Sequence, residues 1–292
     1  MTRLAALALL LAAMPAAAQT APDTTRARYQ AFGATGAALP LDAMLDEAVA
    51  YDVVFVGEIH DDPTAHAVEL AVLDGLARRA GMREVVLAVE MFEADVQTAL
   101  DEYLAGLISE RDFLDAARPW QNYADYRPLV EYAKSHGLRV VASNAPVRYV
   151  RAVARGTDLS GRTLTALPPL PVAPASAAMT AAFGEAMGGM GAHGGPSLDG
   201  MVAAQNLRDA SMAWQTAQVL LGASRALVVH VNGAFHTAGG RGIPEHLARY
   251  APAARAFRID IAPVADVDAQ PASIDADAVV QTPARLVPSR NR

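Results

Sequence analysis

The stretch from Asp52 to Pro63 reads DVVFVGEIHDDP, and it decides the fold. Residues 53–56 form a continuous apolar run, which is typical of a strand buried on both faces of a sheet. Gly57 lets the backbone turn sharply where this strand ends. Asp62 then offers a helix N-cap, and Pro63 suits the first turn of a helix. The pattern predicts a buried strand followed closely by a helix.

The same order recurs along the chain. Further apolar strands are predicted at residues 85–89, 138–142, 226–231 and 256–261. Helices are predicted at 42–50, 63–80, 94–117 with a break near Gly106, and 125–135. Strands that alternate with helices predict an α/β fold, with a mainly parallel central sheet and helices on both faces, loosely Rossmann-like. No G-x-G-x-x-G motif follows the first strand, so a dinucleotide site has no support.

The N-terminus has the pattern of a targeting segment. Arg3 precedes an apolar run over residues 4–13, and Ala16–Ala18 is a small-residue cleavage site. The run is too short to span a bilayer. We expect a signal peptide over residues 1–18, cleavage after Ala18 and a periplasmic protein. The chain has no cysteine, so a lipidated cysteine cannot anchor it.

The remaining composition sets the domain organisation. The chain has 292 residues, 52% of them hydrophobic, which is enough for a large core. We expect a lead-in over residues 19–40, an α/β domain over 41–265 and a mobile or loosely docked tail over 266–292. Residues 165–200 form a predicted insertion, Pro-rich at first and then rich in Met and Gly; it is either a lid or a loop. The net charge of −7 gives no support for nucleic-acid binding.

Polar residues follow four of the predicted strands. Glu58 and His60 follow the first strand, Glu90 the second, Asn144 the third and His236 the fourth. In a parallel α/β sheet, ligands bind outside the carboxyl ends of the strands. The two histidines come from matched G-x-x-H motifs at residues 57–60 and 233–236. Imidazole and carboxylate groups at one edge suit a divalent metal ion or acid–base chemistry.

The other histidines have structural interpretations. His230 lies inside an apolar run and is predicted to be a core histidine bonded to backbone. For His66, beside Glu69 in the first turns of its helix, two interpretations stay open: a functional role, or a solvated or capping position. His136 and His246 lie near predicted helix ends, where a histidine complements the helix dipole.

Aromatic residues gather between residues 120 and 132. Tyr123 and Tyr126 belong to this group, and a tyrosinate can bind haem iron. The alternative is that these side chains pack a helix onto the sheet. Met179 and its neighbours in the insertion have similar alternatives, because a thioether can bind haem iron or simply fill an apolar helix face.

An ordered series of short motifs resembles the ChaN-like haem-binding uptake family of the Tiki superfamily. The matching segments are 56–61, 89–92, 120–131, 142–146, 204–213, 231–236 and 240–244. They span roughly residues 45–260. The resemblance implies an α/β fold and an exported protein linked to haem-iron acquisition. It also implies distant kinship with metal-dependent peptidases and erythromycin-esterase-like enzymes.

The resemblance implies haem as the ligand, with a homodimer and an outer-membrane haem receptor as partner hypotheses. Asn144, Tyr123 and Tyr126 are candidate haem contacts, and Tyr149 is a further candidate iron ligand. Arginines pair well with the carboxylates of haem propionates, and the candidates are Arg148, Arg208 and Arg241.

Two other hypotheses stay open. In a metal-dependent hydrolase, His60, His236 and Glu90 would hold a divalent metal ion and Glu58 would activate its water. No H-E-x-x-H motif is present, so this would not be an ordinary zinc peptidase. In the remaining hypothesis, a catalytically inactive relative of these enzymes binds a protein partner.

Overall fold

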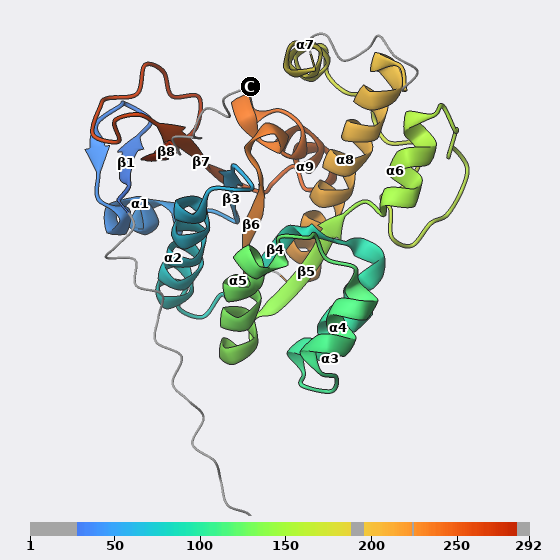
Figure 1. Cartoon of the computed structure of the whole chain (residues 1–292), viewed down its shortest axis with the longest axis horizontal. Coiled ribbons are helices and arrows are strands. Elements are labelled where there is room, and N and C mark those ends of the chain that lie inside the picture. The colour runs from blue at the N-terminus through green and yellow to red at the C-terminus, as the bar shows by residue number, and fades with distance from the viewer. Residues whose placement is uncertain (1–27, 188–195, 224, 285–292) are drawn as a thin grey trace, which may run out of the picture.

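The computed structural model describes residues 28–187, 196–223 and 225–284 (Figure 1). The predicted signal peptide lies outside the described residues, as do residues 19–27 of the predicted lead-in and residues 285–292. The strands are β1 (Gln30–Gly33), β2 (Ala38–Leu39), β3 (Val53–Glu58), β4 (Glu84–Glu93), β5 (Arg139–Asn144), β6 (Ala226–Gly233), β7 (Ala256–Val264) and β8 (Ala278–Pro283). The helices are α1 (Leu41–Ala48), α2 (Pro63–Arg79), α3 (Gln97–Leu104), α4 (Glu110–Ala117), α5 (Tyr123–His136), α6 (Val147–Ala154), α7 (Ala177–Ala186), α8 (Leu198–Gly222) and α9 (Ile243–Tyr250).

The eight described strands form one sheet in the order β2-β1-β8-β7-β3-β6-β4-β5. The six strands from β8 to β5 are parallel to one another, whereas β1 is antiparallel to both β8 and β2. The predicted α/β fold with a mainly parallel sheet is confirmed. β3 and β6 occupy the centre and are buried along their whole length, which explains their nearly continuous apolar sequence.

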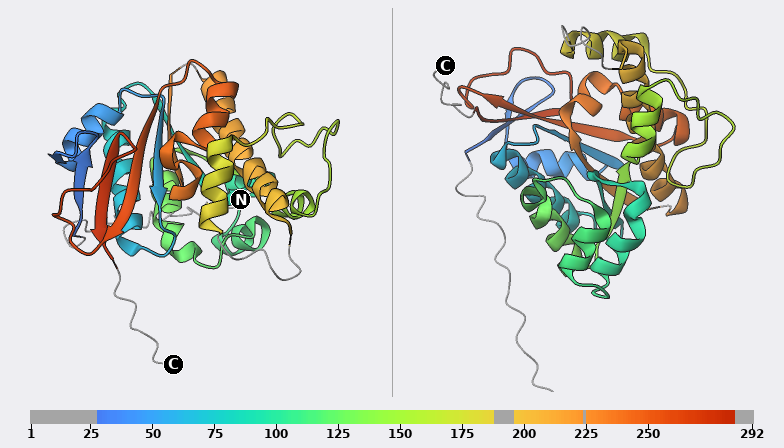
Figure 2. Two further views of the ribbon diagram at one scale, coloured as in Figure 1. Left: turned by 90° about the horizontal axis from the view of Figure 1, so that it is seen from above. Right: turned by 45° about the vertical axis from the view of Figure 1, so that its right-hand side comes forward.

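Helices cover both faces of this sheet, and Figure 2 shows the sheet between the two layers. One face packs on α1, α2, α3, α4 and α5 through a large core that includes Val54, Leu73 and Leu129. The opposite face packs on α8 and α9 through a smaller core that includes Phe55 and Met212. Among the described residues, no helix has the length and apolarity needed to cross a membrane.

The helix after β3 begins and ends as its sequence predicts. The Asp62 side chain accepts a hydrogen bond from the Thr64 amide at 2.8 Å, and Pro63 is the first residue of α2. This cap fixes the chain direction directly after the first G-x-x-H motif. Its consequence is that the first turns of α2 lie beside the carboxyl end of β3.

The sheet extends beyond both predicted ends of the α/β domain. Within the predicted lead-in, residues 30–33 form β1 and residues 38–39 form β2. The prediction of a loosely docked tail is wrong for residues 278–283, because they form β8, which pairs with β7 and β1. Ala278 and Val280 are fully buried. The apolar run of β8 is short and lies in an Ala/Asp/Pro-rich segment, so the local sequence does not indicate a strand. One of its partner strands, β1, lies far away in the chain.

The insertion packs against the domain where it is described. Residues 167–172 contact α6 and α8 through a third apolar cluster that includes Leu167 and Leu207. The Met- and Gly-rich part begins with helix α7, in which Met179 is buried. Residues 188–195, including Met190 and His193, lie outside the described residues. Helix α8 begins at Leu198, and the sequence pattern did not predict this helix.

Candidate functional site

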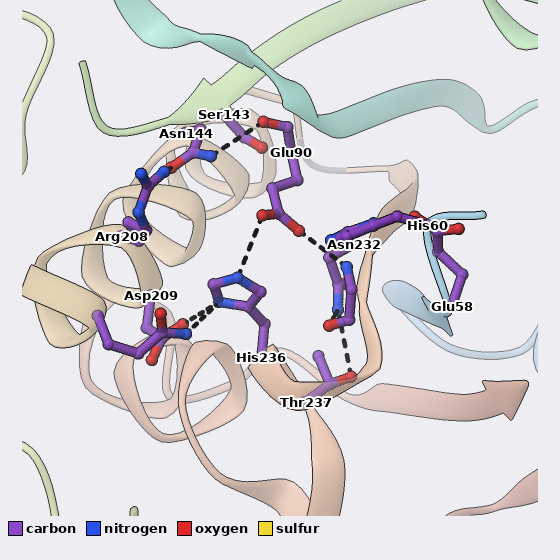
Figure 3. Close-up of polar contacts among 12 residues, drawn as sticks. Glu58, His60, Glu90, Ser143, Asn144, Arg208, Asp209, Asn232, His236 and Thr237 are labelled. Atoms are coloured by element: carbon purple, nitrogen blue, oxygen red, sulfur yellow. Dashed lines mark hydrogen bonds and ion pairs between the residues drawn. The ribbon is translucent and has the colours of Figure 1, made fainter. Parts of the chain in front are cut away.

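The strand-end residues converge on the carboxyl edge of the sheet, as predicted (Figure 3). Glu90 of β4 lies at the centre of this group. Its Oε1 is 3.2 Å from Nε2 of His236, and its Oε2 accepts a hydrogen bond from the Gly233 amide at 2.8 Å. Glu90 therefore joins the ends of β4 and β6. We call the group formed by Glu58, His60, Glu90, Asn144 and His236 the strand-end site.

His236 has carboxylates on both sides of its ring. Its Nδ1 donates to the buried carboxylate of Asp209 on α8, opposite Glu90. Burial lowers the pKa of His236, but the charges of Glu90 and Asp209 outweigh burial and raise the pKa to about 10. Burial raises the pKa of Glu90, yet His236 and the Gly233 amide lower it to about 2. The buried pair is therefore a charged ion pair at neutral pH.

His60 is the open member of the strand-end site, since 45% of its side chain is exposed. Its Nδ1 lies 2.5 Å from Oε1 of Glu58, whose side chain is fully buried. The Tyr126 hydroxyl donates to the same oxygen at 2.8 Å. Burial lowers the pKa of His60, but the hydrogen bond that its ring donates to Glu58 and the charge of Glu90 outweigh burial and raise the pKa. A carboxylate that accepts a hydrogen bond from one imidazole nitrogen fixes the orientation of the ring. It also makes the other ring nitrogen a stronger metal ligand.

Two glycines let these elements approach closely. A Cβ on Gly233 would lie 2.8 Å from Cε1 and 3.0 Å from Nε2 of His60. A Cβ on Gly57 would lie 3.0 Å from the Cα of Ala234. Gly57 remains within β3, so close packing against the second G-x-x-H motif, rather than the predicted sharp turn, accounts for this glycine.

Partly exposed apolar side chains border the strand-end site. The ring of Trp120 packs edge-on against His60, with centroids 4.8 Å apart. Ile59, next to His60, is 42% exposed. Phe235 precedes His236 and contacts Phe183 of α7, with ring centroids 5.8 Å apart. An accessible imidazole beside exposed apolar surface suits a flat apolar ligand that carries a metal ion.

Asn144 and Arg208 also belong to this edge of the sheet. The Asn144 amide donates to the backbone carbonyl of Glu90 at 3.1 Å, and Arg208 donates to Oδ1 of Asn144 at 3.1 Å. Arg208 is half-buried and brings a positive charge to the strand ends. Arg208 is a predicted propionate partner, and it lies beside Asn144, a predicted haem contact.

Other predicted residues lie elsewhere. Tyr123 is buried against Phe92 and Phe113, and its hydroxyl has no partner among the described residues. Arg148 pairs with Asp95, which also binds Arg118. Neither side chain forms a hydrogen bond or ion pair with the strand-end site, because α5 and α6 turn these positions toward other neighbours. The predictions of Tyr123 and Arg148 as ligand contacts therefore find no support in this arrangement.

The structural roles predicted for three histidines are corrected. His230 is buried as predicted, but it bonds to the side chains of Asn232 and Ser143 instead of backbone, at 3.0 and 3.3 Å. His246 is buried in α9 and bonds to Asn206 at 2.9 Å, so it does more than complement a helix dipole. His66 is neither solvated nor a helix cap, because its ring is buried and contacts the backbone carbonyl of His60 in the strand-end site.

His66 belongs to a group that the sequence did not reveal. Its Nδ1 lies 3.3 Å from Oε2 of Glu69, one turn along α2, and 3.7 Å from Oε2 of Glu58. Glu69 is fully buried and burial raises its pKa. The available signal was the i, i+3 spacing of His66 and Glu69 on the helix that follows the first G-x-x-H motif.

The three predicted metal ligands, His60, His236 and Glu90, do not converge on one point. Within the described parts of the chain, Glu58, His66 and Glu69 are the group whose ligand atoms all lie within 4.8 Å of one another. His60, His236 and Glu90 do not form such a group. Glu90 and His236 instead neutralise each other as an ion pair. The geometry therefore does not favour the hydrolase with a metal ion held by His60, His236 and Glu90.

A family model described as haem-binding uptake, Tiki superfamily, ChaN matches residues 44–247. The chain belongs to this family. The match spans the strand-end site from β3 to the residues after β6, and it confirms the resemblance of the short motifs. Haem binding is the property that names the family.

A solved structure agrees with this assignment at the level of the fold. A structure that describes cofacial haem binding to ChaN of Campylobacter jejuni superposes with a TM-score of 0.66 and 17% identity, covering 86% of this chain and 96% of that one. The type III effector HopBA1 is more distant, with a TM-score of 0.45 and 14% identity over 90% of this chain and all of that one.

A curated relative matches in part. The chloroplastic protein RETICULATA-RELATED 5 of Arabidopsis thaliana is 28% identical over 122 residues, which is 38% of this chain. The matched part is 17% of that protein's length. This chain is therefore similar to a small portion of that relative.

Proposed function

We propose that this protein binds haem at the strand-end site and takes part in haem-iron uptake in the periplasm. The observation that carries the proposal is His60, a half-exposed imidazole backed by buried Glu58, in a chain of the haem-binding uptake family. Ligation by imidazole is common for haem iron. No hydrogen bond to Nε2 of His60 is found in the described part of the chain, so this nitrogen is the one that would bind iron.

The surroundings of His60 suit the rest of a haem molecule. Trp120 and Ile59 offer apolar surface to the porphyrin, and the half-buried Arg208 offers a guanidinium to a propionate. Glu58 fixes the His60 ring through Nδ1, and the Tyr126 hydroxyl in turn holds the Glu58 carboxylate. These residues of the protein bind and orient the ligand, and the iron chemistry belongs to the haem itself.

Haem titration followed by absorption spectroscopy tests this proposal. We expect a saturable shift of the Soret band with the wild-type protein, and at least about tenfold weaker binding for His60→Ala, a loss of about 1.4 kcal/mol. His136→Ala is the matched control, because His136 is exposed at the far end of α5. A wild-type protein without saturable binding would overturn the proposal. Equal affinity of His60→Ala and wild type would overturn the placement of haem at His60.

Location and partners are separate parts of the proposal. Signal-peptide cleavage after Ala18 gives a mature protein that begins at Gln19, which N-terminal sequencing of the periplasmic fraction tests. We further propose a homodimer and delivery of haem by an outer-membrane receptor. Light scattering with and without haem tests the dimer, and a monomer under both conditions would refute it. Co-purification with the receptor from haem-fed cells tests delivery.

A further inference from the structure

A second polar cluster lies behind His60, where β3 meets the first turns of α2. It consists of Glu58, His66 and Glu69. The side chains of Glu58 and Glu69 are fully buried, and 8% of the His66 side chain is exposed. Tyr126 closes one side, with its ring 4.7 Å from that of His66. Two carboxylates in such an enclosed place need a compensating positive charge.

Hydrogen bonds within the protein do not satisfy this cluster. Oε2 of Glu58 and Oε1 of Glu69 are buried and have no hydrogen-bond partner among the described residues. A buried carboxylate oxygen without a partner costs several kcal/mol in general and is rare in folded proteins. The two unpartnered oxygens belong to neighbouring side chains of the same cluster. This pattern indicates a group that both carboxylates bind.

The orientation of His66 adds a third ligand atom. Its Nε2 donates to the backbone carbonyl of His60 at 3.3 Å. When Nε2 carries the hydrogen, Nδ1 presents its lone pair to Glu58 and Glu69. A hydrogen bond from the second ring nitrogen to a carbonyl is the usual way that proteins orient a metal-binding histidine.

We propose that Glu58, His66 and Glu69 bind a divalent metal ion. Nδ1 of His66 lies 3.7 Å from Oε2 of Glu58 and 3.3 Å from Oε2 of Glu69. Two ligands of a tetrahedral zinc ion at about 2.1 Å are roughly 3.4 Å apart, so small side-chain shifts complete the set. One imidazole and two carboxylates suit Zn²⁺, Mn²⁺ or Fe²⁺.

A proton is the competing occupant. A proton on Nδ1 of His66 makes the contact to Oε2 of Glu69, but it leaves Oε1 of Glu69 and Oε2 of Glu58 without a partner. A divalent ion binds both carboxylates and balances their charges at the same time. This metal site does not depend on haem binding, because its ligands differ from the proposed iron ligand.

The ion would have a positioning role for the strand-end site. Glu58 would bind it through Oε2, while Oε1 keeps its contact with Nδ1 of His60. The ion would thereby fix the Glu58 carboxylate and tie α2 to β3. Metal binding and the position of His60 would then be coupled through a single side chain.

Metal analysis of haem-free protein tests this site, with zinc and manganese as probes. We expect one equivalent of Zn²⁺ or Mn²⁺ to bind the EDTA-treated wild type and to raise its Tm. Glu69→Gln keeps the shape of the side chain but removes its charge, and it should weaken binding at least about tenfold. Glu84→Gln is the control, because Glu84 is an exposed glutamate at the start of β4. Glu90→Gln is compared with it to test for an ion at the strand-end site instead.

Three results would overturn the proposal. The first is wild-type protein that takes up neither metal in a saturable way. The second is Glu69→Gln that binds the metal as tightly as wild type. The third is loss of the metal in Glu90→Gln but not in Glu69→Gln, which would place the ion at the strand-end site. If Glu69→Gln does not fold, His66→Gln replaces it in the same comparison.

Discussion

Oε1 of Glu90 lies 3.2 Å from Nε2 of His236, and this buried pair joins the carboxyl ends of β4 and β6. The second G-x-x-H motif therefore ends in a histidine that is already paired. Only 9% of the His236 side chain is exposed, whereas 45% of the His60 side chain is exposed. The two motifs look equivalent in the sequence but differ in the structure: His236 joins the strand ends, and His60 has an open ring, to which we assign the haem iron.

Glu90→Gln should destabilise the protein. The substitution leaves a buried, positively charged His236 with one carboxylate instead of two, and breaking a buried ion pair costs roughly 3 kcal/mol. Urea denaturation measures this loss. Glu84→Gln is the control, because Glu84 is exposed at the start of the same strand and should change the stability by less than about 0.5 kcal/mol. Equal stabilities of the two variants would contradict the structural role of the pair.

Alkaline pH should weaken the fold through His236. The pKa of His236 rises from 6.5 to about 10 on folding, so its contribution is complete below pH 6.5 and is lost as the pH rises through 10. The slope is at most about 1.4 kcal/mol per pH unit for one group. We expect His236→Gln to flatten the pH dependence of the unfolding free energy in this range. In the metal-free protein, part of the slope should remain, because the pKa of His66 is also raised. An unchanged slope would exclude His236 as its source.

Gly233→Ala should displace His60 without unfolding the protein. The added Cβ would lie 2.8 Å from Cε1 of the His60 ring, which has to move. We expect roughly tenfold weaker haem binding, or about 1.4 kcal/mol, in a Soret titration. Gly222→Ala is the control, because a Cβ there meets no atom within 4 Å. If both variants bind haem as wild type does, the position of His60 does not matter for the ligand.

Tyr123 and Tyr126 should respond differently to replacement by Phe. Burial and the charge of Glu58 raise the pKa of Tyr126, whose hydroxyl donates to Glu58, so Tyr126→Phe should cost about 1–2 kcal/mol. Tyr123→Phe removes a buried hydroxyl that has no partner in the described part of the chain, so stability should be unchanged or higher. Thermal unfolding measures both effects. Loss of the haem spectrum in Tyr123→Phe would show that a tyrosinate, not His60, binds the iron.

Local sequence signals predicted much of the fold. The apolar runs of β3, β4, β5, β6 and β7 and the helix after Asp62 follow from short-range periodicity and capping. β8 was missed because its identity as a strand depends on pairing with β1 and β7 across the sheet. Helix α8 was missed because most of its faces are covered, so its sequence lacks a clear amphipathic stripe.

The sequence by itself determined which residues meet at the strand ends, since the carboxyl ends of parallel strands lie at one edge of a sheet. Glu58, His60, Glu90, Asn144 and His236 were all found in this way. Tertiary structure alone decided what each residue does there. Whether an imidazole is open, like His60, or enclosed, like His236, depends on the helix packed over it. The packing of α2 likewise brings Glu69 and His66 to Glu58, because the distance between a helix and a strand end is set by core side chains far from either motif.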